Sequence, residues 1–137
     1  MNDKEYRDWE RQVEKVKINN NKLLVEFSNY LQSKSLKSKT IKNHINNMEF
    51  YGNDFLLRYE IIPIEKGALE IGSFLGDYFI RKVCWASKYT IQENIASFKK
   101  FYTFLNEIDK ISKTELDEMK AIIKDEKLDW IGEAEAY

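Results

Sequence analysis

Four lysines gather in one short stretch and are the side chains of this sequence best suited to bind a ligand. They are Lys34, Lys37, Lys39 and Lys42, and no acidic residue lies among them. Positive charges at this density can neutralise phosphates, and the free N–H groups of a helix that begins here would point toward the same anion. A solvated, lysine-rich turn is the alternative interpretation.

Polar side chains accompany these lysines. If the following helix lay in a groove of nucleic acid, its polar side chains could reach base edges or phosphates: Thr40, Asn43, Asn46 and Asn47. On any exposed helix such residues also form the ordinary solvated face, which is the competing interpretation. A second basic group follows about fifty residues later, and its members are Lys88, Lys99 and Lys100.

Other common site chemistries are excluded by residue type. His44 and Cys84 are the only histidine and the only cysteine, so this chain alone cannot assemble a Cys/His zinc site. The Gly-rich phosphate cradles GxGxxG and GxxxxGK[ST] are absent. We therefore predict no enzyme activity, no catalytic residue, no metal and no cofactor. His44 is expected to be a packed or half-exposed helix residue rather than a ligand, and Cys84 is expected to be a small buried hydrophobe beside Trp85.

The composition indicates what kind of fold positions these residues. The chain has 137 residues, 43% hydrophobic and 14% aromatic, with a net charge of -1, which favours one folded domain over a disordered chain. Five glycines and one proline provide too few turns for an all-β protein. No apolar run approaches the roughly 18 residues of a membrane span, and a lone cysteine favours a reducing compartment. We expect a single all-α domain over residues 1–137, soluble and cytoplasmic.

Apolar residues recur at helical spacing through most of the chain. Asn19-Asn20-Asn21 and the Pro63 loop (61–67) predict interruptions. The predicted divisions are an N-terminal helix in 1–21, a first hairpin in 22–60, a second hairpin in 68–108 and an acidic C-terminal helix in 112–132. The two long helices are predicted at 39–60 and 88–107, and the predicted helix caps are Ser38, Ser87 and Ser112.

Two segments share one pattern fifty residues apart, in which a short helix and a polar turn precede Thr-Ile and a longer apolar stripe. The first stripe is Thr40-Ile41, Ile45, Met48, Gly52 and Phe55, and the second is Thr90-Ile91, Ile95, Phe98, Tyr102 and Leu105. Ordinary core-facing periodicity is the alternative explanation. We interpret the pattern as two packed helical hairpins in a domain of five to six helices. Phe98 is then a core residue, and Gly52 allows two helices to approach closely.

The residues of both hairpins resemble a known family. The stretch Phe27-Ser28-Asn29-Tyr30-Leu31, followed by the basic turn and Thr40-Ile41, is similar to the first hairpin of the N-terminal core-binding domain of tyrosine recombinases and phage-type integrases. The segment from Ser87-Lys88-Tyr89-Thr90-Ile91 to Phe101-Tyr102-Thr103-Phe104-Leu105 resembles the second hairpin of that domain. The resemblance spans about residues 23–108, and its motifs consist largely of hydrophobic periodicity.

This resemblance implies a SAM-like helical clamp on double-stranded DNA that acts in DNA recombination, with a recombinase or another protein as a further partner and no membrane. The DNA-binding residues that it implies are Lys37, Ser38, Lys39, Thr40, Lys42, Asn43, Lys88, Thr90 and Lys99. The chain departs from the family at Gln92-Glu93, where basic residues are common, and at His44, where tyrosine is usual. The recombinase catalytic domain is absent, so the chain cannot cut DNA by that route.

The charge distribution favours a different class of function. The pI is near 5.9, and residues 114–137 hold eight acidic side chains against three lysines. A helical protein–protein interaction module that has lost DNA binding is therefore the alternative function. The acidic segment is expected to be a structural helix, and its carboxylates could also screen the lysines from nucleic acid.

Overall fold

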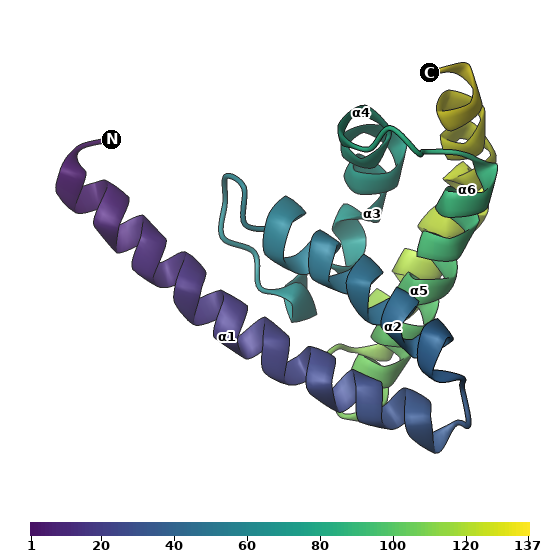
Figure 1. The fold of residues 1–137 in the computed structure, drawn as a ribbon, viewed down its shortest axis with the longest axis horizontal. Helices are drawn as coiled ribbons and strands as arrows, with labels where there is room; N and C mark the ends of the chain where they lie inside the picture. The colour runs from purple at the N-terminus through teal and green to yellow at the C-terminus, as the bar shows by residue number, and fades with distance from the viewer. The chain divides into compact units, whose positions relative to one another are not determined.

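The computed structural model describes residues 1–137, and every regular element in it is helical (Figure 1). The predicted all-α fold is therefore confirmed, with six α-helical elements and no strand. None of the helices combines the length and the apolar character that crossing a membrane requires. The contacts divide the chain into two compact units, Met1–Ile64 and Glu65–Tyr137. We describe each unit by itself.

The first unit is a helical hairpin with one very long arm. Helix α1 (Asp3–Ser33) is followed after a short turn by α2 (Ser38–Glu49), which packs back on α1 and continues as a π-helical segment, η1 (Phe50–Phe55). In Figure 1, α1 is the long purple rod and α2 turns back beside its C-terminal part. The core of this unit comes from the facing sides of these elements: Leu23, Leu24, Phe27, Leu31, Ile41, Met48, Tyr51, Phe55 and Leu56.

The predicted interruption at Asn19–Asn21 was wrong, because α1 runs through it without a break. Asn20 is completely buried, and its amide nitrogen donates to the Gly52 carbonyl (3.3 Å) and to Asn53 Oδ1 (3.0 Å). Its amide oxygen accepts the backbone N–H of Ile64 at 3.2 Å. The asparagine therefore anchors the chain that follows η1 onto α1. Its partners lie 32 to 44 residues away, beyond the reach of a local turn rule.

The second half of the first hairpin also differs from the prediction. The expected helix over 39–60 ends as an α-helix at Glu49, passes through η1 and has unwound by Tyr59, which is 79% exposed instead of lying on the apolar stripe. The guanidinium of Arg58 stacks 3.9 Å from the centroid of the Phe55 ring and donates to the Phe55 carbonyl (2.8 Å). Trp9 Nε1 donates to the Tyr59 carbonyl at 3.4 Å. These contacts hold the unwound end against the rest of the unit.

The second unit is built around the pair α5 (Lys88–Glu107) and α6 (Lys113–Ala136), which pack on each other. Before them, the short 3₁₀ turns η2 (Ile64–Lys66) and η3 (Ala68–Glu70) lead into α3 (Ile71–Ser73), the π-helical η4 (Phe74–Tyr78) and α4 (Phe79–Lys82). Helix α6 also packs on η3, α3 and η4, so it is the common partner within this unit. Its core is dominated by fully buried rings: Phe74, Phe98, Phe101 and Tyr102.

The caps that were predicted for this unit are confirmed. Ser87 accepts the backbone N–H of Thr90 (3.3 Å), and the Thr90 hydroxyl accepts the backbone N–H of Ser87 (2.9 Å), which forms a reciprocal capping box. Ser112 accepts the backbone N–H of Glu115 at 3.1 Å. Helix α5 has the predicted bounds, and α6 continues four residues beyond the predicted end at 132. Cys84 corrects another prediction, because it is exposed on the linker before α5 rather than buried.

Gly52 lies where another segment approaches closely, as predicted, although its neighbour is Ile64 of η2 rather than a second long helix. A Cβ at this position would lie 2.5 Å from Ile64 Cδ1 and 3.1 Å from Cγ1. Ile64 is completely buried, so its side chain has little room to yield. The missing side chain therefore permits Ile64 to pack against η1.

Gly52→Ala is expected to lower the free energy of unfolding by about 1–3 kcal/mol, because it overpacks the contact with Ile64. The matched control is Gly132→Ala in α6, where a Cβ would meet no atom within 4 Å. That control should raise stability by up to about 1 kcal/mol through helix propensity. Urea unfolding followed by circular dichroism measures both, and an unchanged midpoint for Gly52→Ala would show that Ile64 can move aside.

Candidate nucleic-acid interface

The basic turn between α1 and α2 is held by a regular helix-ending motif. Ser35 has a left-handed backbone (φ 63°), its N–H donates to the Gln32 carbonyl (2.9 Å), and the Leu36 N–H donates to the Leu31 carbonyl (3.3 Å). This pattern is a Schellman motif, which ends a helix and fixes the direction of the chain that follows. The half-buried Leu36 completes the motif beside the buried Leu31. The lysines of the turn are therefore presented by an ordered backbone.

Helix α2 begins without a side-chain cap. Its N-cap residue is Lys37, whose side chain cannot accept a hydrogen bond, so the prediction that Ser38 caps the helix was wrong. The other long helices are each capped by a side chain, from Asn2, Ser87 or Ser112. The first backbone N–H groups of a helix have no acceptor within the helix. In α2 they are left to solvent or to an external anion.

The six candidate residues of the first unit lie together on this uncapped turn. All six are exposed, and none of them takes part in an ion pair: Lys37, Ser38, Lys39, Thr40, Lys42 and Asn43. Residues 27–48 contain no acidic side chain. The structure therefore brings three lysines and three short polar side chains to one exposed helix start, with no carboxylate from that stretch of chain to neutralise it. The Lys34 ammonium lies 5.4 Å from the ring centroid of Tyr30, one turn before the helix end.

The three candidate residues of the second unit are spread along α5, and two of them already form hydrogen bonds within the chain. Lys88 and Lys99 are exposed, and they are separated by three turns of α5, or about 16 Å along its axis. The Thr90 hydroxyl is used within the chain, because it accepts from Ser87 N and contacts the Trp85 carbonyl at 3.2 Å. Glu135 of α6 accepts the backbone N–H of Lys88 at 2.8 Å. One carboxylate of the acidic helix thus lies at the start of α5, where it complements the positive end of the helix dipole.

The two units also differ in net charge. The first carries eleven basic and nine acidic side chains, a net charge of +2, whereas the second carries eleven basic and fourteen acidic side chains, a net charge of -3. Attraction to a polyanion is therefore stronger at the first unit. Of the two candidate surfaces, the uncapped start of α2 has the more favourable electrostatics.

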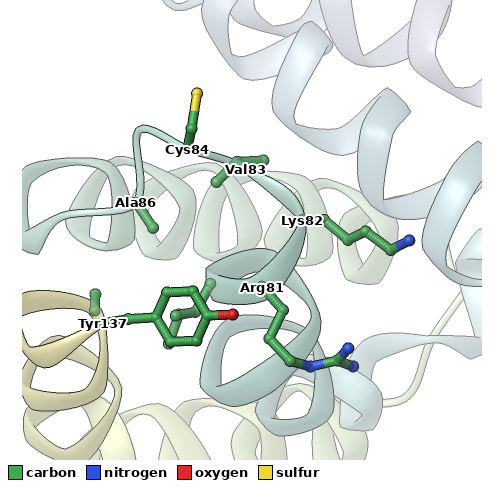
Figure 2. Close-up of a pocket in the computed structure, with 8 residues that line it drawn as sticks. Arg81, Lys82, Val83, Cys84, Ala86 and Tyr137 are labelled. Atoms are coloured by element: carbon green, nitrogen blue, oxygen red, sulfur yellow. The ribbon is translucent and has the colours of Figure 1, made fainter.

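The second unit contains a pocket of about 300 Å³ between α4, the linker to α5 and the end of α6. Its lining combines apolar and cationic side chains, among them Ile80, Arg81, Lys82, Ala86, Ala134 and Tyr137. Figure 2 shows the hydroxyl of Tyr137 directed toward Arg81, and the Cys84 thiol pointing away from them. The sequence reasoning missed this site, although the lack of any acidic residue from 78 to 92 was a signal that could have indicated it.

The buried polar groups of the second unit belong to its core. Burial raises the pKa of the Tyr102 hydroxyl well above its usual value, and the nearby carboxylates of Glu115 and Glu65 raise it further. The phenol therefore stays neutral at physiological pH.

His44 of α2 is buried, as expected for a packed helix residue. No group of three or more His, Cys, Asp or Glu side chains lies close enough together to hold a metal ion.

Comparison of the chain with protein-family models, with curated protein sequences and with solved structures gives no match.

Proposed function

We propose that this chain is a non-catalytic protein that binds double-stranded DNA through the start of α2. The observation that carries the proposal is the exposed, uncapped helix start at Lys37, with two further lysines close behind it and no acidic residue between 27 and 48. Phosphate contacts of this kind supply most of the sequence-independent affinity for DNA.

The geometry suits a phosphate in two ways. The backbone N–H groups of Ser38, Lys39 and Thr40 are free of side-chain acceptors, and the helix dipole favours an anion at the same place. The side chains of Lys37, Lys39 and Lys42 are exposed and can reach neighbouring phosphates. Asn43, one turn into α2, can add a contact to a base edge or to the backbone.

The resemblance of the two Thr-Ile segments to the core-binding domain of tyrosine recombinases supports the same function. In that family the corresponding helices lie toward the major groove. The proposal carries over the binding of duplex DNA but not DNA cleavage, because the His-x-x-Arg unit of the catalytic domain has no counterpart here: His44 is followed by Ile45-Asn46-Asn47. A place in DNA recombination, as an accessory or a relic of an integrase system, is part of the proposal.

The triple variant Lys37→Gln, Lys39→Gln, Lys42→Gln tests the proposal. With phosphate contacts from these three lysines, the parent should show a log–log salt slope of about -2.7, which is about a 40-fold loss of affinity between 50 and 200 mM salt. The triple variant should bind more weakly at 50 mM and lose little further affinity over that range. Fluorescence anisotropy with a labelled duplex measures both.

A control with the same change of net charge separates local contacts from long-range attraction. Lys110→Gln, Lys120→Gln, Lys124→Gln removes three exposed lysines of the second unit and should leave the salt slope near that of the parent. If the two triple variants behave alike, the DNA site does not lie at the start of α2. If the parent does not bind duplex DNA at low salt, the proposal is wrong.

A helical protein-interaction module is the second candidate function. The observation that favours it is the pair Ile18 and Val25, which are exposed on α1 seven residues apart and therefore lie on one side of the helix. Exposed aliphatic side chains at this spacing fit a partner helix. Failure of duplex binding at low salt would favour this function.

A further inference from the structure

Two aromatic rings are exposed around the start of α5. Trp85 is 63% exposed, and Tyr89, four residues later in the first turn of α5, is 69% exposed. The aliphatic residues around them are buried, including Ile80, Val83 and Ile91. Of the large apolar side chains in residues 80–91, only these two aromatic rings are therefore exposed. A surface that docks on an apolar protein face would also expose aliphatic side chains.

The charge of this segment is positive. No acidic residue lies between 78 and 92, while Arg81, Lys82 and Lys88 do. Two carboxylates face the segment from outside it: Asp77 pairs with Arg81 at 2.8 Å, and Glu135 accepts the Lys88 backbone N–H. The ammonium groups of Lys82 and Lys88 take part in no ion pair, and both side chains are exposed.

The backbone that carries Trp85 is held in place. The Thr90 hydroxyl contacts the Trp85 carbonyl at 3.2 Å, and the capping box of Ser87 and Thr90 fixes the start of α5. Both chain neighbours of Trp85 line the pocket of about 300 Å³, whose wall includes the ring of Tyr137 (Figure 2). The two exposed rings thus lie near a concave site whose lining combines apolar and cationic side chains.

We propose that the segment from Arg81 to Tyr89 binds single-stranded nucleic acid, with bases stacked on Trp85 and Tyr89 and phosphates held by Lys82 and Lys88. Rings alternating with cations suit this ligand, because every base has a flat face and every nucleotide has a negative charge. The pocket beside Trp85 is large enough to belong to the range of small-ligand sites and can receive one unstacked base. The inference does not depend on duplex binding at α2, since it concerns other residues in the other unit.

The experiment uses the full chain and a labelled twelve-nucleotide oligo(dT) at 50 mM salt, read by fluorescence anisotropy. Trp85→Ala should weaken binding about 5- to 150-fold, the range expected for loss of one base stack. Trp85→Phe retains a ring and should stay within about 3-fold of the parent. Lys82→Gln with Lys88→Gln should make the salt slope shallower by about 1.4.

A second readout locates the stacked base. Oligo(dT) should quench tryptophan emission of the parent, and this quenching should be lost in Trp85→Phe while the affinity is kept. Trp9→Phe is the matched control and should leave the quenching in place. Because Trp85 is exposed, its variants should melt like the parent, which circular dichroism verifies.

Three outcomes overturn the inference: no binding of oligo(dT) at 50 mM, an unchanged affinity for Trp85→Ala, or equal affinity for Trp85→Leu and the parent, which would indicate apolar contact without stacking. The same titrations with duplex DNA keep the two proposals apart. Binding of duplex but not of oligo(dT) would remove this inference and leave the DNA-binding function. Binding of oligo(dT) but not of duplex would support this inference and contradict the proposed duplex binding at α2.

Discussion

Replacing Phe98 with alanine is expected to lower the free energy of unfolding of the second unit by about 3–5 kcal/mol. Phe98 is completely buried on α5, and its ring centroid lies 6.1 Å from that of Phe74 and 6.0 Å from that of Tyr102. The alanine would therefore leave a cavity among rings that cannot close it without losing their mutual contacts. The loss is a large part of the total stability of an ordinary domain.

Chemical unfolding followed by circular dichroism measures this effect. Phe98→Leu should cost less than Phe98→Ala, because it fills most of the cavity. Tyr89→Ala is the matched control on the same helix, and it should change stability by no more than about 0.5 kcal/mol because its ring is exposed. A stability of Phe98→Ala close to that of the parent would mean that the ring cluster does not hold α5 in place.

Asn20→Ala is expected to lower the free energy of unfolding of the first unit by about 2–4 kcal/mol. The change removes the side-chain oxygen that accepts the buried Ile64 N–H and removes one donor from the Gly52 carbonyl. Each buried polar group that loses its partner costs about 1–3 kcal/mol. Thermal melting and urea unfolding should both report the loss.

The neighbouring Asn21→Ala is the control for Asn20→Ala. Asn21 is exposed and accepts a single hydrogen bond from Asn53 at 2.9 Å, so its removal should cost less than about 1 kcal/mol. Amide hydrogen exchange adds a local readout, because the Ile64 N–H should exchange faster in Asn20→Ala. Similar stabilities for the two variants would show that the buried network does not anchor the chain after η1.

The features of the fold that were predictable depend on local chemistry. Ser87 and Ser112 cap the helices that follow them because each serine hydroxyl reaches an N–H only three residues ahead. Phe98 is buried because the apolar spacing of α5 is regular over its whole length. The asparagine triplet was misjudged for the opposite reason: a buried Asn20 is stabilised by partners on Gly52 and Ile64 that a local rule does not include.

The candidate interface was predictable only in part. Lysines at 37, 39 and 42 are exposed because burying an ammonium group is costly, so their exposure follows from residue type. The lack of a cap on α2 did not follow, since a serine stands one residue after the N-cap position. The contact between Glu135 and the Lys88 N–H spans 47 residues and needs the packing of α6 on α5, which no local pattern encodes.

The two π-helical segments have a consequence for how this sequence is aligned with others. In η1 the Leu56 N–H donates to the Tyr51 carbonyl, and after η4 the Phe79 N–H donates to the Phe74 carbonyl, five residues back in each case. Such a turn holds one residue more than an α-helical turn. A homologue that lacks this residue can keep the same core on both sides of the gap. A single-residue deletion at 50–55 or at 74–78 is therefore expected to preserve the fold, and an alignment without a gap there would pair core positions with surface ones.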